Sequence, residues 1–222
     1  MNVLAKHIER RKDDKMKRLL YLGFAFFFIS AVAFGQGKES KPKVTGETKK
    51  VETKKYMKRN VADPEIAIET DEGVMKLELF PDVAPAHVDS MLSLIKKGFY
   101  NGLTFHRIID GFMIQGGDPK GDGSGNAGYN LPAEFSQLKP IEGTLSMARA
   151  QDPNSASCQF FICLAAAPHL DGKYTIFGQL MEGTEALHKI GKVQVQGDRP
   201  VKPVFIRKMT VLKDKPEKKT EK

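Results

Sequence analysis

The sequence predicts a mainly β fold, a closed antiparallel β-barrel capped by two α-helices. Three observations support this prediction: many short segments alternate apolar and polar residues, only two segments carry apolar residues at helical spacing, and Gly and Pro residues separate the segments. A closed barrel leaves no long sheet edge exposed. The 222 residues suffice for one such core with flanking segments.

The first strands are expected at 66–68 and 74–79, joined as a hairpin around 71–73, because apolar residues alternate on both sides of the Asp-Glu-Gly turn. The segment 84–97 follows, and its apolar residues recur at spacings of three and four, which predicts an amphipathic helix. Pro85 suits the first turn of that helix. The apolar positions are Val88, Met91, Leu92 and Ile95.

Residues 105–119 are the centre of the predicted barrel. Apolar residues occupy alternate positions on both sides of Asp110-Gly111, a dipeptide that favours a tight hairpin turn. Two paired strands would place Arg107, Met113 and Gln115 on a rigid sheet. Further strands are expected at 143–147, 160–164, 174–180 and 204–212, and a second helix at 184–190.

The formal net charge of +8 is unevenly distributed along the chain. Residues 63–214 hold 15 of the 35 basic and 19 of the 27 acidic side chains, so the predicted folded part carries −4 and the flanks carry +12. A DNA-binding or RNA-binding domain concentrates its basic residues on the folded part. We therefore expect no nucleic-acid partner.

The N-terminal residues 1–35 predict an export signal. Met16-Lys17-Arg18 supplies a basic start, an apolar run follows from Leu19 to Ala33, and Ala31-Val32-Ala33 fits a cleavage site. Met16 is then the expected start of translation. The alternative is an uncleaved anchor in the inner membrane, because the run reaches the short end of spanning lengths. Both predict a domain that acts outside the cytoplasm, periplasmic or secreted.

Two charged segments flank the predicted domain at 63–213. Residues 36–62 are rich in Lys, Glu, Thr and Ser and almost free of large apolar side chains, so they cannot compensate the entropy lost on ordering. A flexible linker is expected there, and a charged tail at 214–222.

The two cysteines, Cys158 and Cys163, lie an odd number of residues apart in what is expected to be one strand. Their side chains then point to opposite faces and cannot bridge each other. With neither a Cys-x-x-Cys pair nor a Cys-His spacing, metal binding is not expected either. Both are interpreted as small apolar core residues.

A glycine-rich segment at 116–129 contains a formal match to the dinucleotide-binding pattern Gly-x-Gly-x-x-Gly at 123–128. That pattern needs a helix directly after it, whereas Asn130-Leu131-Pro132 follows here, so a nucleotide-dependent enzyme has little support. Acidic and amide residues recur at every fourth position, which does not fit a calcium loop. A tight loop packed beside the site is expected.

The run Phe-His-Arg-Ile-Ile-Asp-Gly-Phe-Met-Ile-Gln-Gly-Gly-Asp-Pro at 105–119 resembles the signature of the cyclophilin family of peptidyl-prolyl isomerases. Ser-Cys-Gln-Phe-Phe-Ile at 157–162 supports the resemblance independently, and it extends over about 63–213. It implies the barrel fold, cis–trans isomerisation of X-Pro bonds in folding proteins, and proline-containing polypeptides as partners. No metal or cofactor is required, and a monomer is expected.

By this resemblance Arg107 is the catalytic residue. Rotation of an X-Pro bond is slow because it breaks amide resonance, a barrier of about 18–20 kcal/mol. As the bond twists, the prolyl nitrogen becomes able to accept a hydrogen bond, and a fixed donor aimed at it stabilises only the twisted state. A guanidinium is a permanently charged donor of this kind. The alternative is a surface arginine in a salt bridge, for example with Asp110.

The resemblance also implies a substrate-binding pocket. Its apolar base would consist of Phe112, Met113, Phe161 and Leu170, and Tyr174 would complete the wall. The peptide carbonyl would be faced by Gln115 and Gln159, with His106 at the rim. A strand edge that pairs with the substrate backbone would be formed by Met147, Ala148 and Arg149. Phe160, on the opposite face from Phe161, is assigned to the core.

Three positions depart from many eukaryotic members: His169 replaces a tryptophan, Arg149 an asparagine and Tyr174 a histidine. These changes resemble bacterial forms, and they imply weak cyclosporin binding. A proline-binding chaperone module with the same fold and little turnover is the alternative function. Retention of Arg107, Phe112, Gln115 and Phe161 favours the enzyme.

Overall fold

The structure is a computed structural model that describes residues 60–215. The expected export signal at 1–35, nearly all of the linker and most of the tail lie outside the described residues. Within residues 60–215, no helix is long and apolar enough to cross a membrane.

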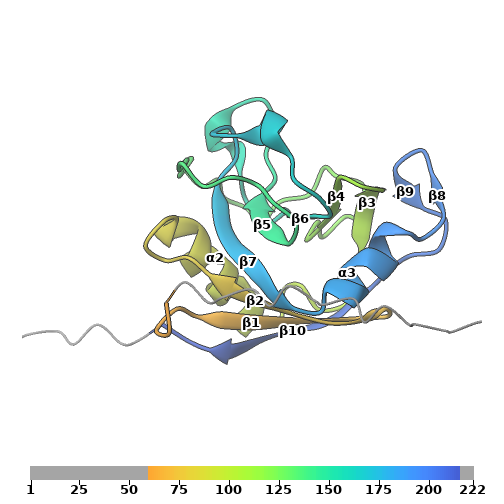
Figure 1. Cartoon of the computed structure of the whole chain (residues 1–222), viewed down its shortest axis with the longest axis horizontal. Coiled ribbons are helices and arrows are strands. Elements are labelled where there is room, and N and C mark those ends of the chain that lie inside the picture. The colour runs from red at the N-terminus through yellow and green to blue at the C-terminus, as the bar shows by residue number, and fades with distance from the viewer. Residues whose placement is uncertain (1–59, 216–222) are drawn as a thin grey trace, which may run out of the picture. The chain divides into compact units, whose positions relative to one another are not determined.

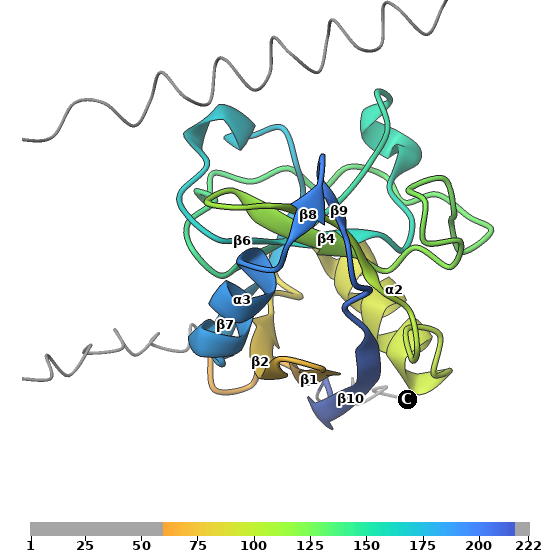
Figure 2. The ribbon, with the colours of Figure 1, turned by 90° about the vertical axis from the view of Figure 1, so that its right-hand side faces the viewer.

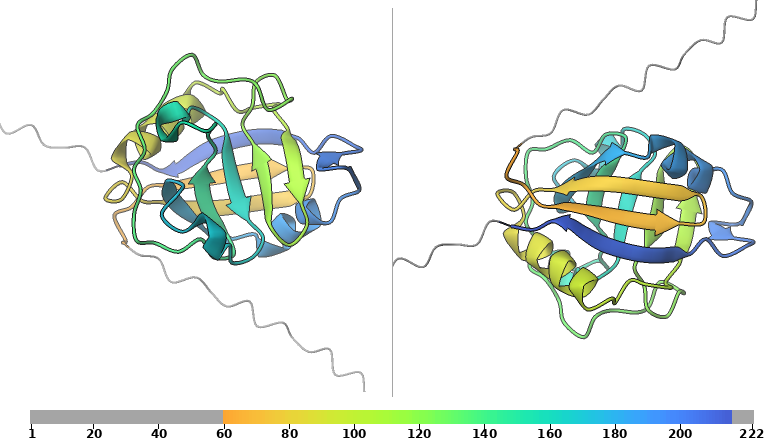
Figure 3. Two further views of the ribbon diagram at one scale, coloured as in Figure 1. Left: turned by 90° about the horizontal axis from the view of Figure 1, so that it is seen from above. Right: turned by 90° about the horizontal axis from the view of Figure 1, so that it is seen from below.

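One antiparallel sheet of eight strands forms the domain, in the order β10-β1-β2-β7-β5-β6-β4-β3. The sheet curls over on itself, so that β5 and β6 lie across from β1 and β2 (Figures 1 and 3). The predicted mainly β fold is confirmed. The strands are β1 (Glu65–Thr70), β2 (Gly73–Leu79), β3 (Phe105–Ile109), β4 (Met113–Gly116), β5 (Thr144–Met147), β6 (Phe160–Cys163), β7 (Ile176–Glu182) and β10 (Ile206–Lys213).

The two edges of the curled sheet meet at one bridge. Thr104 and Phe205 pair just outside β3 and β10, and the Ile206 amide donates to the Leu103 carbonyl at 2.7 Å. Pro203 has no N–H to donate, so the pairing cannot continue as a ladder into the preceding loop. The barrel is thus closed by a short bridge.

Two helices cover opposite sides of the barrel, α2 (Pro85–Lys96) beside β10 and α3 (Thr184–Gly191) against β2 and β4 (Figure 2). The four apolar positions predicted for the first helix are all buried, and Pro85 is its first residue. Gly98, with φ +69°, follows the last turn, and its amide donates to the Ile95 carbonyl at 2.9 Å.

Strand β6 separates two apolar clusters because both of its faces are covered. Phe160 and Ile162 point into the main core of the barrel, whereas Phe161 and Cys163 join Met113 in a smaller cluster on the outer side. Cys158 belongs to the main core, and both cysteines are free and buried. The core assignment of Phe160 is confirmed. Cys158 precedes β6, so the two cysteines do not share one strand as expected, although their side chains do lie in different clusters.

Four short elements were not predicted, because elements of two or three residues have no apolar periodicity. They are the 3₁₀ turns η1 (Pro153–Ser155) and η2 (Pro168–Leu170) and the hairpin strands β8 (Val195–Gln196) and β9 (Arg199–Pro200). The β8–β9 hairpin lies beside β3 (Figure 1).

Candidate active site

An open pocket of about 310 Å³ lies on the outer side of the sheet, over the smaller apolar cluster. It brings together nine of the twelve residues predicted for the site. These are Arg107, Phe112, Met113, Gln115, Ala148, Arg149, Phe161, Leu170 and Tyr174.

The floor of the pocket is apolar and rigid. Met113 and Phe161 are buried, and they stand on β4 and β6, which pair Met113 with Cys163 and Gln115 with Phe161. The Phe161 ring meets the Tyr174 ring edge-on, with centroids 5.6 Å apart. Paired strands and interlocked rings hold this floor in one shape.

Arg107 projects from β3 at the side of this floor, opposite Gln115 in the ladder. Its Nε donates to the Asp198 carboxylate at 2.8 Å, and Nη1 donates to Gln115 Oε1 at 3.4 Å. Asp110, the partner considered from the sequence, instead accepts from Lys192 at 2.8 Å. The ion pair of Arg107 therefore fixes the guanidinium at the pocket and does not draw it away.

Gln159 lies behind Gln115, in an adjoining hollow of about 330 Å³. Gln115 Nε2 donates to Gln159 Oε1 at 3.0 Å, and Gln159 Nε2 donates to the carbonyls of Gly123 and Gly125 at 3.0 and 2.8 Å. A chain of amide hydrogen bonds thus connects Arg107 to the glycine-rich loop. Of the predicted polar residues, Gln115 faces the pocket and Gln159 supports it.

His106 does not reach the pocket. It lies where the register of β3 against β4 shifts, between Phe105 and Arg107, and its side chain is buried and lines no part of the pocket. Within residues 60–215 its ring nitrogens find no hydrogen-bond partner, and burial is the main cause that lowers its pKa. The expected place at the rim is therefore corrected to a buried position.

The expected strand edge for the substrate backbone is also more limited than predicted. Strand β5 lies between β6 and β7, so it is not an edge strand. The Met147 amide donates to Thr175 and the Ala148 amide to Gln159, at 3.0 and 2.8 Å. A substrate backbone can pair only beyond Ala148, where the chain leaves the sheet.

Arg149 braces the wall of the pocket. Its guanidinium lies over the Tyr174 ring, 4.8 Å from the centroid, and donates to the carbonyls of Lys173, Ala150 and Gln151. These contacts join the loop after β5 to the turn before β7. Arg149 thus orders two loops that frame the pocket.

Residues 65–211 match the family model described as "Cyclophilin type peptidyl-prolyl cis-trans isomerase/CLD". The chain belongs to this family. The family and the enzyme class predicted from the sequence, peptidyl-prolyl cis-trans isomerase, are confirmed. This cyclophilin is 42% identical over 170 residues to a "Probable peptidyl-prolyl cis-trans isomerase" of Brucella suis biovar 1, covering 70% of this chain and 87% of that protein.

Two further relatives agree. The cyclophilin is 46% identical over 132 residues to a "Peptidyl-prolyl cis-trans isomerase" of Synechococcus elongatus, covering 60% of this chain and 89% of that one. It is also similar to a crystal structure of a Cryptosporidium parvum cyclophilin type isomerase "in the presence of dipeptide ala-pro", with TM-score 0.65 and 35% identity, covering 68% and 99% of the two chains.

Sequence reasoning missed three carboxylates that hold the frame of this cyclophilin site. Asp198 binds Arg107, and the buried Asp118 accepts the amides of Lys120, Asp122 and Gly123, which shapes the glycine-rich loop. Asp118 could have been found as the first residue of an Asx turn. Asp198 lies 91 residues from its partner, so no local pattern marks it.

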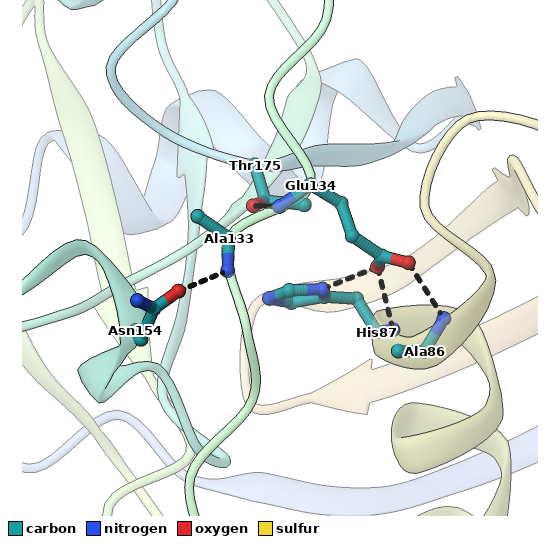
Figure 4. A network of polar contacts seen from close by, with 6 residues as sticks. All are labelled: Ala86, His87, Ala133, Glu134, Asn154 and Thr175. Atoms are coloured by element: carbon teal, nitrogen blue, oxygen red, sulfur yellow. Dashed lines mark hydrogen bonds and ion pairs between the residues drawn. The ribbon is translucent and has the colours of Figure 1, made fainter.

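The third is Glu134, which ties the loop after the glycine-rich segment to helix α2 (Figure 4). Its carboxylate accepts from the amides of Ala86 and His87 at 3.0 and 3.1 Å and lies 2.6 Å from His87 Nδ1. Its own amide donates to Thr175, next to Tyr174 of the pocket. Ala84 precedes helix α2 and has no side chain that can accept from the first helix amides. This missing cap is the one feature of the sequence that indicates an anion from elsewhere in the chain.

Proposed function

We propose that this cyclophilin accelerates X-Pro rotation by a hydrogen bond from Arg107 to the prolyl nitrogen in the twisted transition state. The observation that supports this is the placement of a fixed guanidinium beside a rigid apolar floor. The hydrogen bonds found for Arg107 use two of its five N–H groups, which leaves others for a substrate. A donor already in place costs no reorganisation when the bond twists.

The proposed substrate is a proline-containing polypeptide, with the prolyl ring on the floor formed by Met113 and Phe161. A pyrrolidine ring is compact and apolar, and the pocket is apolar at its base and polar at the Arg107 side. Gln115 Oε1 lies 3.4 Å from Arg107 Nη1, so the same edge carries an amide able to bind a backbone group. The Ala-Pro dipeptide that was present with the Cryptosporidium parvum cyclophilin has the same chemistry.

The first test compares Arg107→Ala with the wild type in a proline-tetrapeptide isomerisation assay. We expect kcat/KM to fall by about 100-fold, since removal of one preorganised donor has effects of that order. Arg207→Ala is the matched control, because Arg207 also donates through Nε to an aspartate, Asp71, but lines no part of the pocket. Equal rates for Arg107→Ala and the wild type would contradict the proposal.

The same assay separates the enzyme from a binding module. A proline-binding chaperone would bind the tetrapeptide but leave its isomerisation at the uncatalysed rate, with or without Arg107. Titration of the peptide into each variant by NMR measures binding independently of turnover. Binding without acceleration in the wild type would favour the chaperone module.

We also propose that this is a bacterial protein whose domain acts outside the cytoplasm, in the periplasm or secreted. The support is the sequence alone: the basic start at Met16, the apolar run Leu19–Ala33 and the Ala-x-Ala pattern at its end. N-terminal sequencing of the mature protein from fractionated cells tests this. A mature chain that begins just after Ala33 supports export, an intact run in the membrane fraction supports the anchor, and intact Met1 in the cytosol would exclude both.

A further inference from the structure

We infer that Asp198, in the β8–β9 hairpin, is a positioning residue for Arg107, and that this hairpin is part of the active-site frame. The inference rests on the proposed role of Arg107. Asp198 lines no part of the pocket and would act on the reaction only through the guanidinium that it holds.

The hairpin holds β3 at two consecutive residues. The Asp198 carboxylate accepts from Arg107 Nε at 2.8 Å, and the Asp198 carbonyl accepts from the Ile108 amide at 2.7 Å. The main-chain bond fixes the place of residue 198 against β3. Its carboxylate is therefore held at the Arg107 side chain by backbone geometry and does not depend on a flexible side chain alone.

The hairpin has few other contacts that could explain its place in the fold. Its strands are two residues long, and none of the residues Val195, Gln196, Arg199 and Pro200 is buried. Apolar burial therefore contributes little to its conformation. Gly197, at φ +67° with nothing within 4 Å of an added Cβ, makes the turn that presents Asp198.

A second contact joins the hairpin to the glycine-rich loop. Arg199 Nη2 donates to the Gly121 carbonyl at 2.5 Å. The same loop accepts from Gln159, which accepts from Gln115, which accepts from Arg107. Arg107 is thus held from two sides, by Asp198 at Nε and by the amide chain at Nη1.

This arrangement has a consequence for catalysis. An arginine side chain has several rotatable bonds, so its rotamer entropy opposes ordering. The Asp198 contact keeps the guanidinium at the pocket before substrate binds, which is the condition for transition-state stabilisation. Ground-state binding depends on the apolar floor, so loss of Asp198 should affect kcat and leave KM nearly unchanged.

The test compares Asp198→Ala with Asp110→Ala in the proline-tetrapeptide assay, with kcat and KM measured separately. Asp110 forms an exposed ion pair of the same length with Lys192, but it does not contact Arg107. We expect Asp198→Ala to lower kcat by about 3- to 10-fold, as loss of one charge-assisted hydrogen bond implies, with KM within about twofold. Asp110→Ala should match the wild type. Asp198→Asn, which keeps an acceptor oxygen, should fall between.

A double variant separates positioning from a structural effect. Asp198→Ala should cause no further loss in the Arg107→Ala background, because its effect passes through that side chain. Added salt should also lower kcat of the wild type toward that of Asp198→Ala and leave the variant unchanged, since the pair is exposed.

The outcomes are distinguishable. If Arg107→Ala keeps the wild-type rate, the proposed function itself fails. If Arg107→Ala is slow but Asp198→Ala has the wild-type kcat, only the positioning role of Asp198 is overturned. An equal loss on Asp198→Ala with and without Arg107 would also overturn it, because the residue would then act on the fold and not on the guanidinium.

Discussion

The two buried thiols report on how tightly the domain is packed, Cys163 under the pocket and Cys158 in the main core. Burial raises the pKa of Cys163 to about 12 and that of Cys158 to about 11. At pH 8 the reactive thiolate is then roughly one part in 10⁴ and one part in 10³ of each thiol.

We therefore expect neither cysteine to react with an aromatic disulfide reagent in the native protein, and both to react once urea unfolds it. The absorbance of the released thiolate gives the rate and the stoichiometry. Rapid labelling of Cys163 in the native protein would show that the pocket floor opens far more readily than its packing indicates, and rapid labelling of Cys158 would show the same for the core.

The sides on which Phe160, Phe161 and His106 lie show how far strand alternation predicts the position of a side chain. Alternation along a strand correctly placed Phe160 in the core and Phe161 at the pocket. The same alternation fails on β3, where Phe105 lies in the core but Arg107 lies at the pocket, because the register shifts between them and His106 is buried at that irregularity. The resemblance had suggested the rim, and neither the resemblance nor simple alternation predicts the buried position of His106.

At the scale of elements, Glu134 acts as the missing cap of helix α2. It accepts two helix amides and contacts the fully buried His87 side chain. Glu134→Ala would leave these amides and the imidazole without their anion, and we expect a loss of about 2–4 kcal/mol in the free energy of unfolding.

Urea unfolding followed by circular dichroism measures this loss. Glu134→Gln is the matched control, because its amide oxygen still accepts one hydrogen bond, and it should lose less. If Glu134→Ala unfolds at the same urea concentration as the wild type, the carboxylate does not cap the helix.

Two glycines of the glycine-rich loop, Gly125 and Gly128, differ in the space around them. A Cβ at Gly125 would collide with the Asp118 carboxylate, which holds the loop amides, whereas a Cβ at Gly128 meets nothing within 4 Å. Gly128 has φ +87°, so its replacement by alanine carries only the backbone cost, about 1–2 kcal/mol.

Gly125→Ala should also weaken the carbonyl contact to Gln159, and through it the support of Gln115. We expect it to lower kcat/KM in the isomerisation assay by about 3- to 10-fold, and Gly128→Ala to leave kcat/KM near the wild-type value. Equal activity of the two variants would mean that the loop does not support the site.

The main strands and both helices were predictable because their apolar residues follow a period of two or of three to four. The β8–β9 hairpin and the position of Glu134 were not, because their partners lie 91 and 47 residues away in the chain. A single polar residue in a loop has no periodicity to mark it. The pocket floor could be predicted from the strands, and the carboxylates that fix its frame could not.

At the scale of the whole domain, the site and the core share their strands. Strand β6 buries one face in the barrel and the other under the pocket, so a change in the packing of the barrel also shifts the position of Phe161. The carboxylates on loops then add the polar frame. Stability and activity should therefore decline together when the barrel is weakened.

The pH dependence of unfolding tests the burial of two histidines in the folded domain, His87 and His106. Burial lowers the pKa of His87 below its usual value of 6.5, more than the contact with Glu134 raises it, and burial is also the main cause that lowers the pKa of His106. Below about pH 6.5 the unfolded chain therefore binds protons at both positions more readily than the folded domain does. Unfolding then becomes more favourable as the pH falls, by up to about 1.4 kcal/mol per pH unit for each histidine.

We therefore expect the urea midpoint to be constant above about pH 7.5, where both states are neutral at these positions, and to decline as the pH falls from 6.5 to 5. The variant His87→Gln should show a shallower decline, and His87→Gln combined with His106→Gln should be nearly flat over this range. The decline should precede the titration of the carboxylates, since the pKa values of Asp71 and Asp198 are lowered from 3.8 by their hydrogen bonds. A midpoint that rises on acidification would mean that these histidines are charged in the folded domain.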